Sequence, residues 1–394
     1  AAAGNKGVPM AGGTASGMAP AARLAIYKVF WTYDGVNTGN TDDVLAAIDQ
    51  AVADGVDVIS LSLGLSGDPE ATYFDDIYML NVHLAGVFVA YAAGNSGRPT
   101  GTNFSTYRTI SSFSPYYLTV GASSILRKGA VLRKPSNESS ASIQSASYPQ
   151  DLAAPRLGSF SSTGPVCRPW TNAYGALPTN SILKPDVIGP GVKVYAAAPG
   201  KKVGEKGSYA EQYGTSMSTP HLAGIAALIL QKHPKWSPAQ VMSAIMTTAI
   251  TSNTDGASIK KSNGGFATPW DMGQGHVYPP KVLDPGLTYD ARAAYYMNFL
   301  AGQSLSRAQE EFPDAKLVSM PPRNLNRASI SVARLKGNLT VIRRVTNVAD
   351  SESTYKVKIK SPKGVSVKVT PKKFTIARDG HSVRSVLAVQ PVEI

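Results

Sequence analysis

Cysteine is almost absent from this 394-residue chain, in which Cys167 is the only one. A single cysteine excludes an internal disulfide framework and any metal centre built from several thiolates. Charged residues are also scarce, at 16% against 43% for hydrophobic residues. This balance is typical of a globular protein with a large core, and it excludes a disordered, solvated chain.

Long hydrophobic runs are missing as well. The apolar stretch Leu222–Leu230 has nine residues, whereas a helix that crosses a bilayer needs about 20. No group of His, Asp and Glu has the spacing of metal ligands, and the sequence contains no glycine-rich phosphate loop. We therefore expect no membrane contact, no metal and no cofactor.

Positive charge is in excess and is concentrated near the C-terminus. The net charge is +13, and from residue 301 onward 17 Lys and Arg stand against 7 Asp and Glu. Lys356, Lys358 and Lys360 alternate with apolar residues, so a strand would carry all three on one face. That face is either a solvated outer surface or a binding surface for an acidic polymer, such as a cell-wall polysaccharide, or for an acidic partner. No aromatic residues suited to base stacking interleave with these charges, so nucleic acid is not an expected partner.

The first two thirds of the chain alternates β-branched runs with helical patterns. Strands are predicted at 24–30, 56–63, 86–94 and 117–121, and helices at 43–53 and 75–84. This rhythm indicates an α/β fold, with a parallel sheet covered by helices on both faces. In such sheets the functional residues gather at the carboxyl ends of the strands.

A further helix is predicted at 237–249, with Ser237 as N-cap and Pro238 at the first helical position. Residues 127–157 read as a surface excursion. Beyond about residue 322 only strands are expected, and these indicate a small β-sandwich; they are at 328–333, 338–347, 354–360, 365–370 and 382–389. We expect a first domain at 1–300, a linker at 301–322 and a β domain at 323–394.

Three short motifs indicate where chemistry takes place. Gly-Thr-Ser ending at Ser216 runs into an apolar helix, so one hydroxyl lies at the positive end of a helix dipole. Asn95 follows a buried strand, and its amide is suited to stabilise a developing oxyanion. Ser62-Leu-Gly64 ends another strand and offers an edge for an extended peptide. The alternatives are that Ser216 is only a helix cap and that Asn95 only supports a turn.

Taken together, these motifs resemble the subtilisin-like serine proteases (peptidase S8), and among them the plant-type subtilases. Further matches in family order include Tyr27-Lys-Val29, Lys184-Pro-Asp186 and Gly273-Gln-Gly-His276. The resemblance implies a subtilisin-like fold followed by a fibronectin type III-like β domain. It also implies a serine endopeptidase acting on peptide or protein substrates. Its catalytic residues would be Ser216 as nucleophile and Asn95 as oxyanion donor, and its substrate-binding residues would be Ser62, Leu63, Gly64, Ala92, Ala93 and Gly94.

The chain departs from the family pattern at its start and in its middle. The family places its catalytic Asp and His before a segment that matches Ala1-Ala-Ala-Gly4, so both would lie upstream of residue 1 and the chain is expected to be a fragment. The usual protease-associated insertion is absent, because only 37 residues separate Ala122 from Phe160. Near the C-terminus, Arg327-Ala328 stands where the family has Tyr-Pro.

None of the five histidines is expected to replace the missing base; they are His83, His221, His233, His276 and His381. His221, for example, lies five residues after Ser216, so on a helix it points about 140° away. The chain by itself is therefore expected to be nearly inactive. The alternative function is that of a pseudoprotease, which binds peptides or acidic cell-wall polymers without cleaving them.

Three N-glycosylation triplets begin at Asn103, Asn137 and Asn338. They favour a secreted glycoprotein, located in the apoplast or the cell wall.

Overall fold

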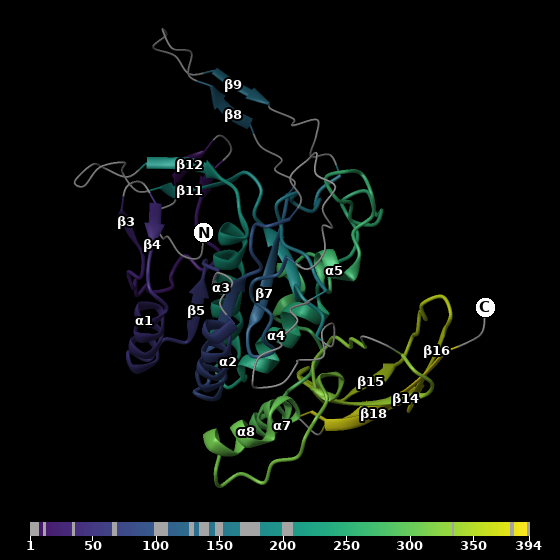
Figure 1. Cartoon of the computed structure of the whole chain (residues 1–394). Helices are drawn as coiled ribbons and strands as arrows, with labels where there is room; N and C mark the ends of the chain where they lie inside the picture. The colour runs from purple at the N-terminus through teal and green to yellow at the C-terminus, as the bar shows by residue number, and fades with distance from the viewer. Residues whose placement is uncertain are drawn as a thin grey trace.

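The computed structural model describes most of the chain, and its larger part is an α/β body (Figure 1). The described residues are 8–10, 13–33, 36–64, 69–97, 109–125, 130–133, 142–145, 153–165, 182–198, 208–332, 335–378 and 382–391.

A four-stranded parallel sheet forms the centre of this body, in the order β10-β7-β6-β5. Its strands are β5 (Val58–Leu61), β6 (Phe88–Ala92), β7 (Leu118–Ser123) and β10 (Val187–Pro190). Helices α1 (Thr41–Ala53) and α2 (Pro69–Leu84) alternate with the first strands along the chain. Every residue of β6 and β7 is buried, which explains why neither strand carries a charged residue.

Helix α3 (Thr215–Lys232) contacts all four strands of the sheet. Leu222, Ile225 and Ile229 are buried on it and belong to the main hydrophobic core. Helix α4 (Pro238–Thr247) follows and begins as predicted, because Ser237 and Gln240 form a reciprocal capping box. The strand ends and the start of α3 thereby meet at one end of the sheet.

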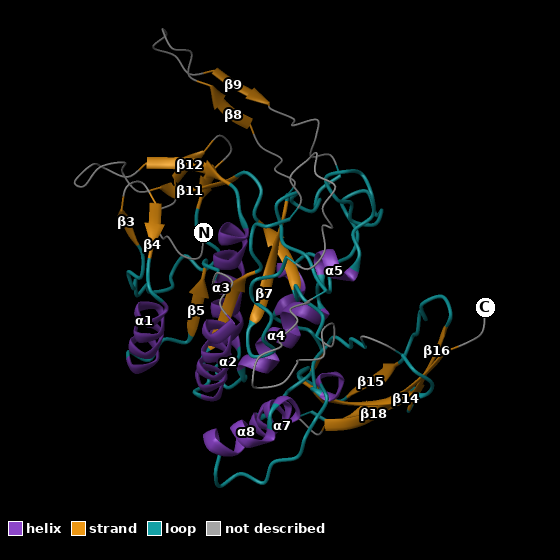
Figure 2. Ribbon diagram, in the orientation of Figure 1, coloured by secondary structure: helices purple, strands orange, loops and turns teal. Residues whose placement is uncertain are grey.

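Four two-stranded hairpins accompany the sheet. They are β1 (Val8–Met10) with β2 (Gly13–Ala15), β3 (Trp31–Tyr33) with β4 (Val36–Thr38), β8 (Ala130–Arg133) with β9 (Ser142–Ser145), and β11 (Val194–Ala198) with β12 (Ser208–Gln212). Those labelled in Figure 2 (β3–β4, β8–β9 and β11–β12) lie toward the upper side of the sheet in that view. The β8–β9 hairpin stands away from the body, in agreement with the predicted surface excursion. The other residues of that excursion between 126 and 152 lie outside the described part.

The strand predicted at 24–30 is wrong, because the structure shows this segment as a loop. Its apolar side chains are unusually exposed, at 63% for Leu24 and 82% for Ile26. Tyr27 packs against the core and donates a hydrogen bond to Asp54. A run with high β-propensity forms a strand only beside a partner strand, and within the described residues this run has none.

The C-terminal part begins with short helices and ends in two small antiparallel sheets. The helices are α5 (Pro269–Met272), α6 (Pro279–Val282), α7 (Ala293–Gln303), α8 (Leu305–Glu311) and the 3-10 turn η1 (Pro322–Asn324). One sheet has the order β13-β14-β18-β16 and the other pairs β15 with β17. Their strands are β13 (Leu287–Thr288), β14 (Leu339–Asn347), β15 (Ser353–Lys356), β16 (Val365–Thr370), β17 (Lys373–Ile376) and β18 (Ser382–Pro391). No helix in the described ranges is long and apolar enough to cross a membrane.

The predictions for this part are confirmed for the strands at 338–347, 365–370 and 382–389. The strand at 328–333 is wrong, because its described residues 328–332 form a loop, and β17 was not predicted. The segment 301–322, predicted as a linker, contains the end of α7 and all of α8. Ala301 and Ala308 are buried there in the main core. The segment that precedes the β domain is therefore packed into the main core.

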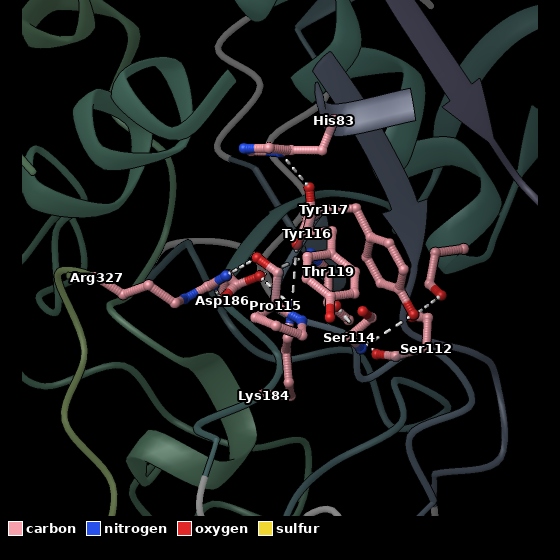
Figure 3. A network of polar contacts seen from close by, with 11 residues as sticks. His83, Ser112, Ser114, Pro115, Tyr116, Tyr117, Thr119, Lys184, Asp186 and Arg327 are labelled. Atoms are coloured by element: carbon pink, nitrogen blue, oxygen red, sulfur yellow. Dashed lines mark hydrogen bonds and ion pairs between the residues drawn. The ribbon is translucent and has the colours of Figure 1, made fainter. Parts of the chain in front are cut away.

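A buried charge network joins the two parts (Figure 3). The carboxylate of Asp186 accepts from Lys184 Nζ at 2.7 Å and from Arg327 Nη2 at 2.5 Å. It also accepts from the backbone N–H of Thr119 at 2.8 Å. Arg327 donates to the carbonyl of Pro115 as well. Arg327 thus reaches from the start of the C-terminal β part into the α/β body.

Candidate active site

The predicted site residues come together where β5 and β6 end and α3 begins. Ser62 and Gly64 follow β5, Asn95 follows β6, and Ser216 is the second residue of α3. These segments lie far apart in sequence, yet two hydrogen bonds join Ser62 directly to Ser216, 154 residues further along. The structure therefore places Asn95 and Ser216 in one site, as the motifs predict.

Ser216 is half-buried, and its hydroxyl donates to the carbonyl of Ser62 at 3.3 Å. The turn in front of it depends on Gly214, whose φ is +147°, a conformation that favours glycine. Gly214 is held from both sides, because its N–H donates to Gly191 O and its carbonyl accepts from Met217 N. The hydroxyl is thus fixed at the N-terminus of a buried helix.

The side chain of Asn95 has a defined orientation. Its Oδ1 accepts from Thr215 N at 2.9 Å and from Thr215 Oγ1 at 3.0 Å. A backbone N–H can only donate, so the atom that faces Thr215 must be the amide oxygen. The Nδ2 group is then turned along Gly214, where an added Cβ would lie 3.4 Å from it. The two N–H hydrogens of the Asn95 amide therefore lie beside Gly214, which immediately precedes Thr215 and Ser216.

The predicted substrate-binding segments lie at the same end of the sheet. Ala92 and Ala93 are buried, whereas Gly94 is half-buried with a φ of +103°. Added side-chain atoms at Gly94 and at Gly64 would lie 2.9 Å and 3.3 Å from the same hydroxyl, that of Ser111. A side chain at Gly94 would therefore be strained and would clash with Ser111, whereas one at Gly64 would make a tight contact with the same hydroxyl.

Each of the four described histidines bonds a backbone carbonyl through its ring. His221 Nδ1 bonds to Met217 O at 2.7 Å, on its own helix. His83 bonds to Tyr116 O, His233 to Leu283 O and His276 to Val277 O. Burial lowers the pKa of His83 and of His276 to about 4. His381 lies outside the described residues.

Two contributors were not predicted from the sequence. Thr215 orients Asn95 through both its amide and its hydroxyl, and the hydroxyl also accepts from Gly94 N at 3.3 Å. The hydroxyl of Ser162 accepts a hydrogen bond from the N–H of Ser96, the residue that follows Asn95. The position of Thr215 next to Ser216 was a usable signal, whereas nothing in the local sequence connects Ser162 with Ser96. Within the described ranges, no group of three or more His, Cys, Asp or Glu residues could hold a metal ion.

Comparison with known proteins accounts for both parts of the chain. Residues 1–275 match the Subtilase family, Peptidase S8. The chain belongs to the subtilase family. Residues 324–392 match a fibronectin type-III domain. The fold is therefore the subtilisin-like α/β fold with its parallel sheet, followed by a fibronectin type III domain of antiparallel strands.

Several plant subtilases align with nearly the whole subtilase chain. It is 30% identical to subtilisin-like protease SBT1.5 of Arabidopsis thaliana, covering 97% of this chain and 65% of that protein. It is 31% identical to subtilisin-like protease SBT3 of Solanum lycopersicum, over 91% of this chain and 61% of that protein. It is 29% identical to the Arabidopsis "CO(2)-response secreted protease", over 95% and 64% respectively. The chain thus spans between 61% and 65% of the length of these relatives.

Proposed function

We propose that this subtilase carries the nucleophile and the oxyanion site of a serine endopeptidase. Ser216 Oγ would attack the carbonyl carbon of a peptide bond, release the amine and form an acyl-enzyme, which water then hydrolyses. The observation that carries the proposal is the orientation of Asn95. Its oxygen is bound by Thr215, so its Nδ2 is left to donate to the tetrahedral oxygen.

The substrate would lie along the two strand ends that flank Ser216. Ser62, Leu63 and Gly64 follow the edge strand β5, which pairs only with β6 among the described residues. An extended peptide would bind to such an edge through main-chain hydrogen bonds. Ala92, Ala93 and Gly94 would form the opposite wall, where Gly94 leaves its surface free of a side chain.

Catalysis by this polypeptide alone is proposed to be weak. The hydroxyl of Ser216 donates to a carbonyl rather than to an imidazole, and a serine needs a base to become a good nucleophile. In subtilisin, loss of the base or of the nucleophile costs about 10⁶ in kcat. An imidazole supplied from outside the described residues would complete the site.

A fluorophosphonate probe with added imidazole tests this proposal. We expect labelling of the 394-residue chain to accelerate with imidazole concentration, because the free base takes the place of a catalytic histidine. Ser216→Ala should abolish labelling, and Asn95→Ala should slow it by about 10²–10³, the effect of losing one oxyanion donor. Mass spectrometry of the labelled peptide identifies the site.

Ser306 offers a matched control for this experiment. It is exposed and is the second residue of α8, just as Ser216 is the second residue of α3. Ser306→Ala should leave labelling unchanged. Labelling that persists in Ser216→Ala would show that the reactive hydroxyl lies elsewhere and would refute the assignment of the nucleophile.

Binding of an acidic polymer, without cleavage, is the second candidate function. Lys356 of β15 lies directly opposite Lys373 of β17, and like charges in that position destabilise a sheet. Further lysines are exposed on the same domain; they are Lys358, Lys360, Lys363, Lys368 and Lys372. Lys358 and Lys360 follow the end of β15 rather than lying within it. A polyanion such as an acidic cell-wall polysaccharide would relieve this repulsion.

Chromatography on immobilised polygalacturonate tests this second candidate. The chain should be retained at low salt, and the Lys356/Lys358/Lys360→Ala variant should elute at a clearly lower salt concentration, because exposed charges are screened by salt. The Lys235/Lys281/Lys316→Ala variant removes the same charge from exposed positions elsewhere and should elute like the parent. If all three proteins elute at the same salt concentration, Lys356, Lys358 and Lys360 do not bind the polymer.

We also propose that the protein is a secreted glycoprotein of the apoplast or the cell wall. Support comes from the relative named a secreted protease and from the three glycosylation triplets. Asn338 is exposed immediately before β14, whereas Asn103 and Asn137 lie outside the described residues. The proposed domains remain 1–300 and 323–394, with 301–322 between them.

A further inference from the structure

Proline at position 220 leaves one backbone carbonyl of α3 without its usual donor. In an α-helix the N–H of each residue donates to the carbonyl four residues earlier. Pro220 lies inside α3, so the carbonyl without a helical donor is that of Ser216. Proline also crowds the carbonyl four residues before it. The backbone of the proposed nucleophile therefore lacks one helical hydrogen bond at its carbonyl.

The hydroxyl of Ser62 supplies the missing hydrogen bond. It donates to the carbonyl of Ser216 at 2.8 Å, while the carbonyl of Ser62 accepts from the Ser216 hydroxyl at 3.3 Å. The two serines thus form a reciprocal pair, with one bond to the backbone of Ser216 and one to its side chain. The pair joins the end of β5 to the first turn of α3.

The neighbouring carbonyls show that this first turn is held by side chains. Thr215 O accepts from Thr219 Oγ1 at 2.8 Å, and Met217 O is bonded by His221 Nδ1 at 2.7 Å. Both of those donors come from α3 itself. Only the carbonyl between them, that of Ser216, is bonded from another element among the described residues, and that element is the proposed substrate-binding segment.

We infer that Ser62 is a positioning residue for the nucleophile, and that its hydroxyl replaces the amide that Pro220 lacks. This inference rests on the proposed role of Ser216. Asn95 fixes the turn at Thr215 N, and Ser62 fixes it two peptide units later at Ser216 O. With both ends of the Thr215-Ser216 pair held, the Ser216 Oγ keeps a constant position between the strand end and the oxyanion donor.

A double-mutant cycle between Ser62 and Pro220 tests the inference in the full chain. Ser62→Ala should accelerate amide hydrogen exchange in residues 215–222 by about tenfold, the loss expected for one hydrogen bond. In Pro220→Ala the new amide supplies the donor, so adding Ser62→Ala should change exchange less than about twofold. Ser62→Thr keeps a hydroxyl and should behave like the parent. An equal effect of Ser62→Ala in both backgrounds, or no effect in either, would overturn the inference.

A thiol at the nucleophile position measures whether positioning affects reactivity. In a Cys167→Ser background, Ser216→Cys needs no external base, because thiols ionise by themselves near pH 8.5. The helix N-terminus should lower the midpoint of its pH profile of alkylation, and Ser62→Ala should move that midpoint back up by about 0.5–1 pH unit. Ser62→Thr and the Ser62→Ala/Pro220→Ala double variant should keep the low midpoint.

The two measurements separate the inference from the function on which it rests. A midpoint near pH 8.5 in the Ser216→Cys parent would contradict an activated nucleophile site, whatever the exchange cycle shows. A low midpoint that Ser62→Ala leaves in place would contradict the positioning role alone. Circular dichroism of each variant confirms that the compared proteins are folded.

Discussion

Asp186→Asn is expected to lower the free energy of unfolding by about 3–5 kcal/mol, the usual cost of removing one partner from a buried ion pair. Asp186 and Lys184 have fully buried side chains, and that of Arg327 is 7% exposed. The substitution leaves two cations inside the protein without a counter-charge. Urea unfolding followed by circular dichroism measures the loss.

Asp284→Asn is the matched control for this result. Asp284 also pairs with a lysine, at 2.6 Å from Lys232, but the two side chains are 74% and 44% exposed. Exposed ion pairs contribute only about 0–1 kcal/mol, so this variant should unfold almost like the parent. Comparable losses for Asp186→Asn and Asp284→Asn would show that burial does not control the strength of the network.

Arg327→Met should cost less than Asp186→Asn, because it leaves Lys184 and Asp186 as a neutral pair. The contact across the two domains is lost, since Arg327 also donates to Pro115 O. Comparing the losses of unfolding free energy in the two variants therefore separates the penalty of unpaired charge from the loss of domain contact. A larger loss in Arg327→Met than in Asp186→Asn would mean that the domain contact contributes more to stability than the pairing of the charges.

Stability is expected to fall steeply as the pH drops from about 6.5 to about 4. Burial lowers the pKa of both His83 and His276 from 6.5 to about 4. Below pH 6.5 the unfolded chain binds protons at these residues and the folded chain does not, so protonation favours unfolding until about pH 4. At pH 5 this amounts to roughly 2 kcal/mol per histidine.

Unfolding of His83→Asn and His276→Asn at several pH values measures this linkage. Asparagine retains an amide donor for Tyr116 O or Val277 O, the carbonyls that the imidazoles bond, and it does not titrate. The free energy of unfolding at pH 8 is the reference for each protein. Between pH 6.5 and 4 it should fall less in each variant than in the parent. Parallel curves for parent and variants would exclude the two histidines as the source.

The sequence predicted elements whose signals are local. Ser237 and Pro238 define the start of α4 through a cap that involves only neighbouring residues. The meeting of Asn95 and Ser216 was predicted because each follows from a motif and from the rule that strand ends share one edge of a parallel sheet. Their roles in catalysis remain predictions that the labelling experiment addresses.

The features that the sequence did not predict depend on distant partners. Asp186 and Arg327 are 141 residues apart, and nothing near either residue indicates an ion pair between them. The bond between Ser62 and Ser216 has the same character. The prediction of a strand at 24–30 is wrong for a related reason. Its β-branched residues favour a strand, but they do not indicate whether a partner strand lies beside them.

The exposed side chains of Leu24 and Ile26 are expected to promote self-association in a concentrated solution. They stand on a loop that has no partner strand among the described residues, shortly before the half-exposed Phe30 and Trp31. Exposed apolar segments of this kind associate with one another and with the unpaired edge strands of other sheets. Lysine in place of Ile26 would interrupt that surface without touching the serine site, and this makes it the first change to consider when preparing the protein for crystallisation.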